Sequence, residues 1–245
     1  MLSQATVSGS NQLSAASREK LIVALDVSTA SAAQKIVAAV GDSALTYKVG
    51  MQLFTAEGPQ IVRDLVAAGR QVFLDLKYHD IPNTVAAAVR EAAQLGVSML
   101  TVHALGGAKM LHAATEAAHA VHPGLKVLGV TVLTSMGDDD LENVGIQGDA
   151  LDAVLRLATL ALYTGCDGIV SSAREAPELR KRLGKKFALV TPGVRPAGGA
   201  HADQVRVVTP AQAIAAGASH IVVFRPITAA ADPAAEAKAI LEEIS

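Results

Sequence analysis

The sequence predicts a (β/α)8 TIM barrel as a single domain, and three observations support this prediction. Short apolar runs alternate with amphipathic helical stretches from Lys20 to the end of the chain. The apolar runs consist mostly of Val, Ile, Leu and Phe, as strands buried on both faces do. Eight strand–helix units in about 225 residues match the size of this barrel. A doubly wound open sheet is the alternative fold, but no glycine-rich dinucleotide motif follows the first strand, where Asp26-Val27-Ser28-Thr29 stands instead.

The expected strands share a β-rich apolar interior between turn signals. They cover residues 21–26, 45–49, 71–76, 99–103, 126–131, 168–171, 187–190 and 220–224. Each is followed by a stretch with the apolar period of a helix. These helices are expected at residues 31–40, 59–68, 84–95, 108–120, 150–163, 173–183, 210–216 and 233–244. Glycine stands just beyond several helix ends, where a left-handed residue closes a helix. These residues are Gly69, Gly96, Gly165, Gly184 and Gly217.

Composition argues against several classes of function. The chain has 245 residues, a formal net charge of -2 and 3% aromatic residues without tryptophan, so no nucleic-acid partner is expected. Charged residues interrupt every apolar stretch before the roughly 18 residues that a membrane span needs, so no membrane partner is expected either. The single cysteine, Cys166, rules out an internal disulfide framework and is typical of a reducing, cytoplasmic setting.

The chain is expected to divide into a tail and one folded domain. Residues 1–17 are polar and small, and they lack the basic start and apolar core of a secretory signal. We expect this segment to be a disordered tail. Residues 18–245 show no break in composition, so they are expected to form one catalytic barrel.

Charged residues stand at the ends of the first three expected strands. In a barrel of this class, chemistry occurs at the carboxyl ends of the strands. Asp26 ends the first strand, Lys48 lies near the end of the second, and the third carries Asp75 and Lys77. Asp75 and Lys77 are two residues apart, so they point to the same side of a strand. Four groups of alternating sign are therefore expected to meet at the barrel mouth. The alternative is an ion-pair network that only fills the barrel end.

The most specific motif is DLKYHDIPNT, from Asp75 to Thr84. It resembles the DxKxxDIPNT signature of the orotidine 5′-phosphate decarboxylase family. The resemblance runs in order from about Leu21 to the end of the chain. The other segments that carry it are LDV with Asp26, YKVG with Lys48, VTVLTSM with Thr134 and Ser135, VTPGVRP with Arg195, ADQ with Gln204, and FRPIT with Arg225.

This resemblance implies a barrel that decarboxylates orotidine 5′-monophosphate to UMP, the last step of UMP synthesis, without a cofactor or metal. Lys77 would be the general acid that protonates C6 of the pyrimidine, with Asp75 beside the departing carboxylate. Lys48 and Asp80 would complete the charge array. Asp26 and Lys48 would hold the ribose hydroxyls. Because no conjugated group beside C6 can accept the electron pair, fixed charge must stabilise the carbanion, and Lys77 supplies that charge.

The resemblance also implies a homodimer with shared sites. Asp80, Ile81 and Thr84 would be contributed to the active site of the partner subunit. Thr134 and Ser135 would contact the pyrimidine, and no further macromolecular partner is expected.

The phosphate end of the substrate is expected at the loops after strands seven and eight, the usual phosphate site of these barrels. The resemblance places Arg195, Phe224 and Arg225 there, with Gln204 bridging base and phosphate. Residues 195–203 have few groups to pack and are expected to form a mobile lid; an ordinary surface loop is the alternative. Phe224 departs from the family, which usually has glycine at that position. A positive φ would be costly for a phenylalanine.

Two other functions fit parts of the pattern. A Mg²⁺-dependent sugar-phosphate lyase or synthase of the same superfamily shares DxKxxD but carries an acidic residue where Lys48 stands. A non-catalytic barrel that binds nucleotide phosphates would keep the phosphate loops and release no CO₂. His103 could line the mouth, but no metal-ligand spacing surrounds it.

Overall fold

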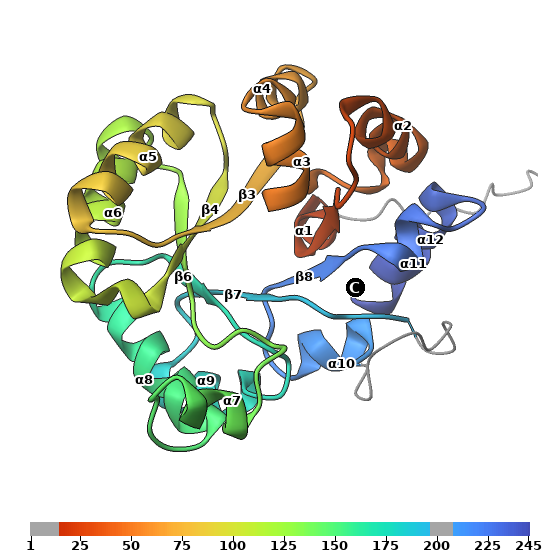
Figure 1. Cartoon of the computed structure of the whole chain (residues 1–245). Helices are drawn as coiled ribbons and strands as arrows, with labels where there is room; N and C mark the ends of the chain where they lie inside the picture. The colour runs from red at the N-terminus through yellow and green to blue at the C-terminus, as the bar shows by residue number, and fades with distance from the viewer. Residues whose placement is uncertain (1–14, 197–207) are drawn as a thin grey trace, which may run out of the picture.

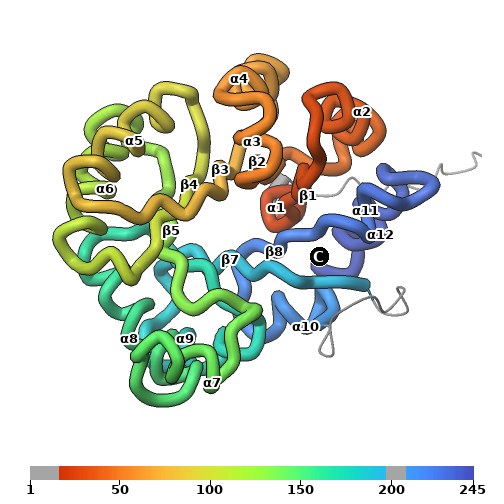
Figure 2. The backbone as a smooth tube through the Cα atoms, viewed as in Figure 1, coloured from red at the N-terminus to blue at the C-terminus, as the bar shows by residue number. Residues whose placement is uncertain are grey.

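The expected barrel is present in the computed structural model, which describes residues 15–196 and 208–245. Eight parallel strands close in the order β1-β2-β3-β4-β5-β6-β7-β8, and helices surround them (Figures 1 and 2). The open-sheet alternative is therefore wrong. The strands are β1 (Leu21–Ala24), β2 (Thr46–Gly50), β3 (Gln71–Tyr78), β4 (Met99–His103), β5 (Lys126–Val130), β6 (Gly168–Val170), β7 (Ala188–Thr191) and β8 (His220–Val223).

The helices follow the strands and form the outer layer (Figure 1). Two short 3₁₀ segments, η1 (Gly41–Ser43) and η2 (Ala104–Gly106), also connect elements of the described chain. The α-helices are α1 (Ala15–Lys20), α2 (Ala30–Val40), α3 (Met51–Glu57), α4 (Gln60–Ala67), α5 (Pro82–Gln94), α6 (Gly107–Val121), α7 (Asp138–Asn143), α8 (Ala150–Tyr163), α9 (Ala176–Leu183), α10 (Pro210–Ala215), α11 (Arg225–Thr228) and α12 (Pro233–Glu243). No helix in the described ranges is long and apolar enough to cross a membrane.

The expected strands and main helices agree with the observed ranges to within a few residues, with some corrections. Residues 15–17 were expected in the tail but form the start of α1, where Ser17 is buried and its Oγ lies 3.4 Å from Ser245 Oγ. The helix forms because α1 packs against β1 and β8, a tertiary contact that polar composition does not reveal. The remainder of the expected tail, residues 1–14, lies outside the described residues. The short helices α3 and α11 were not expected: α3 follows β2 directly, and a single residue, Phe224, separates α11 from β8.

Strand alternation divides the side chains between two apolar regions. Tyr47 and Leu74 point outward and belong to the large core between strands and helices. The inward residues form a smaller apolar layer across the middle of the barrel. Its buried members are Ile22, Ala24, Phe73, Met99, Leu128, Val190 and Val222. This middle layer separates a charged layer at the carboxyl ends of the strands from a polar layer at their amino ends.

The amino-end layer contains polar side chains from the first residues of several strands. Thr46 Oγ1 donates a hydrogen bond to Gln71 Oε1 across 3.1 Å. His220 begins β8, and its ring Nδ1 is buried without a hydrogen-bond partner within the described chain. Burial, with a smaller contribution from the positive charge of Lys126, lowers the pKa of His220 to about 4. The imidazole is therefore neutral in the folded protein at neutral pH.

This half-buried histidine should make the fold sensitive to acid. Its folded pKa of about 4 lies below the value near 6.5 in an unfolded chain, so the unfolded chain takes up the proton first as the pH falls. The stabilisation is complete above about pH 6.5 and declines toward pH 4. We expect the His220 contribution to the free energy of unfolding to fall by about 2 kcal/mol between pH 7 and pH 5.

Urea denaturation at several pH values measures this effect. His220→Gln should flatten the pH dependence by that amount. His112→Gln is the matched control, because the His112 side chain is 63% exposed and its replacement should leave the slope unchanged. Equal slopes for wild type and His220→Gln would contradict the assignment.

Candidate active site

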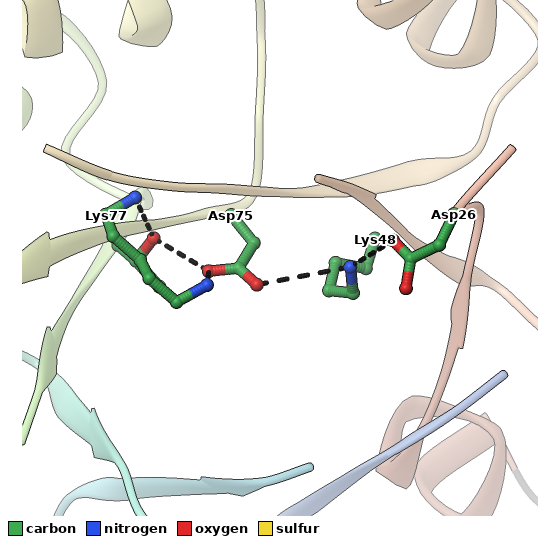
Figure 3. A network of polar contacts seen from close by, with 5 residues as sticks. Asp26, Lys48, Asp75 and Lys77 are labelled. Carbon is green, nitrogen blue, oxygen red and sulfur yellow. Dashed lines mark hydrogen bonds and ion pairs between the residues drawn. The ribbon is translucent and has the colours of Figure 1, made fainter. Parts of the chain in front are cut away.

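Four charged side chains of alternating sign form a row at the carboxyl end of the barrel (Figure 3). Lys48 Nζ lies 2.6 Å from Asp26 Oδ1 and 4.0 Å from Asp75 Oδ2. Lys77 Nζ lies 2.9 Å from Asp75 Oδ1. Asp75 is therefore the central carboxylate, with one ammonium group on each oxygen. The four groups were expected to meet because they stand at strand ends, and they do meet.

The strands place these side chains by register. Ala24 pairs with Lys48 across β1 and β2, and Gly50 pairs with Asp75 across β2 and β3. Gly50 leaves room for the row, because a β-carbon there would lie 3.0 Å from Lys48 Nζ and 3.1 Å from Asp26 Oδ1. Because Gly50 has no side chain, the Lys48 ammonium group can lie beside Asp26.

The end of β3 is irregular at the position of Lys77. Leu74 pairs with Leu100 but Tyr78 pairs with Val102, so β3 uses four residues where β4 uses two. Lys77 has a φ of 51°. Among the described residues, every other positive φ belongs to a glycine. Such strain is uncommon for lysine and is found more often at functional sites. The bulge keeps Lys77 Nζ within hydrogen-bond distance of Asp75.

Thr101 on β4 contacts the row, and no sequence motif predicted this residue. Its Oγ1 accepts a hydrogen bond from the Lys77 backbone N–H (2.9 Å) and donates one to Asp75 Oδ1 (3.0 Å). The Thr101 residue is completely buried. The available signal was the strand alternation of β4, which turns Thr101 inward together with His103.

The charges are largely withdrawn from water. The exposed fraction of the side chain is 11% for Lys48, 15% for Asp75, 26% for Lys77 and 37% for Asp26. Ion pairs with this burial contribute little to stability compared with apolar residues of similar volume. A network that only fills the barrel end is therefore a poor explanation, and the arrangement favours a chemical role.

A cavity of about 760 Å³ lies over the ends of β5, β6 and β7, across the barrel from the row. Its lining includes Thr134, Ser135, Ser172, Glu175 and Gly193. Ser172 Oγ donates a hydrogen bond to Glu175 Oε2 within the segment between β6 and α9. The exposed hydroxyls of Thr134 and Ser135 are available to a polar ligand in this cavity.

The loop after β3 carries the residues expected to serve a partner subunit. Asp80 is exposed, and its Oδ1 accepts a hydrogen bond from the N–H of Ile81 (2.6 Å). Ile81 is 67% exposed, and Thr84 is exposed in the first turn of α5. The structure does not bring Asp80 to Lys77 within this chain, since Asp80 makes no ion pair among the described residues.

The candidate phosphate residues lie at the ends of β7 and β8. The backbone N–H of Arg195 donates to Val208 O (3.1 Å), and Arg225 is exposed at the start of α11. Phe224 has a φ of -119°, so the strain considered for a phenylalanine at the usual glycine position does not arise. Its ring packs on the apolar middle layer. Gln204 and most of the expected lid lie outside the described residues.

Two histidines stand at the same end of the barrel. The His79 and His103 rings stack with centroids 5.3 Å apart, and His103 Nδ1 accepts a hydrogen bond from the N–H of Leu105. Burial lowers the pKa of His103, with smaller contributions from the positive charges of His79 and Lys77. No cluster of His, Cys, Asp and Glu in the described part of the chain has the form of a metal site.

Fold and site together place the chain among the (β/α)8-barrel enzymes, whose reactive groups stand at the carboxyl ends of the strands. The chain belongs to the orotidine 5′-phosphate decarboxylase / HUMPS family, whose model matches residues 19–240. An orotidine 5′-phosphate decarboxylase of Halorhodospira halophila is 54% identical over 226 residues, which cover 92% of this chain and 96% of that protein. One of Nitrosococcus oceani is 51% identical over 230 residues, covering 93% and 98%.

The fold is also similar to that of a solved structure of the same family. The crystal structure of orotidine 5′-phosphate decarboxylase from Lactobacillus acidophilus superposes with a TM-score of 0.84 at 41% sequence identity. The match covers 92% of this chain and 98% of that one. The similarity therefore extends over the whole barrel and is not confined to the charged motif of β3.

The space at Gly50 generates a structural prediction. In Gly50→Ala the new methyl group should push the Lys48 ammonium away from Asp26, to a separation above about 3.2 Å in a crystal structure. The free energy of unfolding should change by less than about 1 kcal/mol, because only the flexible end of a lysine has to move.

Gly124→Ala is the control for this substitution. A β-carbon at Gly124 would meet only the ring of His122, at 3.4 Å or more. The Lys48–Asp26 pair should stay intact in that variant. An unchanged separation of 2.6 Å in Gly50→Ala would show that the glycine is not needed for the row.

Proposed function

We propose that this protein decarboxylates orotidine 5′-monophosphate to UMP and CO₂, the last step of UMP synthesis, without a cofactor. The observation that carries the proposal is the fixed row of Asp26, Lys48, Asp75 and Lys77 at the barrel mouth. Family membership and the names of the relatives support it. We also propose that residues 18–245 act as one catalytic domain, and that the protein works in the cytoplasm, where the buried free thiol of Cys166 would remain reduced.

The chemistry follows from the properties of the row. When the bond between C6 and the carboxylate breaks, CO₂ leaves and the electron pair stays on C6. No conjugated group beside C6 accepts this pair, so a positive charge nearby must stabilise it. In this proposal Lys77, which pairs with Asp75 as an ammonium ion, stabilises the electron pair and then transfers an N–H proton to C6. The products are UMP, CO₂ and the neutral amine of Lys77, which regains a proton from solvent.

The other members of the row have separate roles in this proposal. Asp75 lies beside the departing carboxylate and holds Lys77 in place. Asp26 and Lys48 hold the ribose hydroxyls, a carboxylate accepting and an ammonium donating hydrogen bonds. Because the four side chains are already paired in the free protein, little rearrangement is required when substrate binds.

The pyrimidine and the phosphate of the substrate are bound by the opposite rim of the barrel. Thr134 and Ser135 contact the pyrimidine from the cavity over β5 to β7. Arg195 and Arg225 bind the phosphate, together with the backbone N–H of Phe224, and Gln204 bridges base and phosphate. A guanidinium group matches a phosphate dianion in charge and geometry. Binding energy gained at the phosphate, far from C6, can serve to align the reacting groups.

The protein acts as a homodimer in this proposal, with Asp80, Ile81 and Thr84 completing the partner's site. Apolar side chains are exposed around this loop. Met51 is 57% exposed after β2, Ile81 is 67% exposed after β3, and Leu105 is 48% exposed after β4. These three strands are neighbours in the barrel, so the side chains follow one another along the same rim. A second copy of the chain would cover them and bring Asp80 to a second row.

A direct assay tests the function. Orotidylate absorbance is followed with EDTA present, and the wild-type protein should convert it to UMP. Lys77→Ala should lose turnover by at least about a thousandfold, because no other group donates the proton to C6. It should still bind UMP in calorimetry, since the phosphate residues lie on other loops.

The alternatives give different results in the same assay. No turnover with EDTA, restored by Mg²⁺, would overturn the proposal in favour of a metal-dependent sugar-phosphate lyase. UMP binding without turnover under either condition would indicate a non-catalytic phosphate-binding barrel. Turnover by Lys77→Ala within about tenfold of wild type would remove Lys77 from the acid role.

The shared site is tested by mixing two inactive variants. Lys77→Ala and Asp80→Ala are unfolded and refolded together in equal amounts. Half of the dimers should be mixed, and each mixed dimer has one site with both substitutions and one with neither. The mixture should recover about a quarter of the wild-type activity by the statistics of a symmetric dimer. Each variant refolded alone is the control. No recovery, with mixed dimers verified by native mass spectrometry, would mean that Asp80 serves its own subunit.

A further inference from the structure

We infer that Thr101 is a positioning residue of the active site: its hydroxyl links the backbone of Lys77 to the carboxylate of Asp75. The inference rests on the proposed decarboxylase function and adds to it a residue outside the DxKxxD motif. Thr101 lies in the middle of β4, between Leu100 and Val102, and is completely buried. Its side chain points into the barrel, and it lies opposite the bulge of β3.

The direction of each hydrogen bond follows from the donors present. The Lys77 backbone N–H must donate, so Thr101 Oγ1 accepts that bond at 2.9 Å. The Thr101 hydroxyl has one proton, which it gives to Asp75 Oδ1 at 3.0 Å. Asp75 Oδ1 also accepts from Lys77 Nζ at 2.9 Å. Lys77 is thus connected to Asp75 twice, directly through its ammonium group and indirectly through its backbone and Thr101.

The bulge explains why this hydroxyl is needed. Between the pairs Leu74–Leu100 and Tyr78–Val102, the regular ladder between β3 and β4 is interrupted. The Lys77 N–H falls in this gap, where a buried donor without a partner would be unfavourable. Thr101 Oγ1 supplies the acceptor that the ladder does not. It thereby holds Lys77 in its unusual backbone conformation, with a φ of 51°.

The same hydroxyl sets the rotation of the Asp75 carboxylate. With Oδ1 held by Thr101 and Lys77, Oδ2 is turned toward Lys48 at 4.0 Å. Without the threonine donor, the carboxylate could rotate and release Lys77 Nζ from its position. Thr101 is fully buried and bonds only to Asp75 and Lys77 among the residues of the site, so it acts through them and not on the substrate.

Thr101→Val tests this role because it preserves the shape and removes only the hydroxyl. We expect kcat for orotidylate to fall by at least about tenfold. The Kd for UMP should stay within about threefold, because the phosphate and ribose contacts remain. Thr101→Ser keeps the hydroxyl and should retain kcat within about threefold of wild type.

Thr131→Val is the matched control. Thr131 is also fully buried and directly follows the neighbouring strand β5, but its Oγ1 donates to Val170 O, away from the row. We expect its kcat to stay within about threefold of wild type. If Thr101→Val fails to fold, Thr101→Ser and Thr101→Ala are compared instead, and the serine variant should be faster by at least about tenfold.

Several outcomes would overturn the inference. These are an unchanged kcat in Thr101→Val, an equal loss in Thr101→Ser, or an equal loss of kcat and UMP affinity in Thr101→Val. A wild-type protein without turnover would overturn the proposed function instead. Crystal structures would then decide the positioning role separately. Lys77 Nζ remaining at its wild-type distance from Asp75 in Thr101→Val would overturn it, and a displaced Lys77 Nζ would support it.

Discussion

Asp75 shares one carboxylate between two ammonium groups, and the geometry of the whole site depends on this contact. Lys77 is held by Oδ1, and Lys48 lies nearest to Oδ2. Two positive charges this close to each other, and largely withdrawn from water, would repel strongly without the negative charge between them. Asp26 continues the alternation on the other side of Lys48. The row is therefore stable only as a set, and each member is oriented by its neighbours.

The barrel supplies the frame that this set requires. Closure fixes the register of β1, β2 and β3, so the relative height of the charged side chains is determined by backbone hydrogen bonds formed elsewhere in the strands. One strand departs from regularity, and it does so at Lys77. Lys77, the proposed general acid, thus stands on the irregular part of an otherwise rigid frame, as is common for functional residues.

The sequence was sufficient to predict the fold and the charged row, because both follow from strong periodic signals. Apolar runs buried on both faces predict the eight strands, and Asp and Lys two residues apart on such a strand are expected on the same side of it, at the mouth. The positive φ of Lys77 could not be predicted, since lysine carries no preference for that conformation, unlike glycine or asparagine. Thr101 was missed because a threonine inside a strand is ordinarily explained by its β-propensity. The helical start at residues 15–17 depends on contacts with β1 and β8, which local composition does not encode.

The apolar middle layer separates the polar residues at the amino end of the barrel from the charged residues at the mouth. Phe73 and Met99 stand between the polar residues at the amino end and the charges at the mouth, and no hydrogen bond among the described residues connects the two. The residue that makes the fold sensitive to acid, His220, and the charged row therefore lie at opposite ends of one domain. A change that improves tolerance to acid at one end has no structural reason to harm catalysis at the other, so the amino end is the place to engineer robustness and the mouth is the place to engineer reactivity.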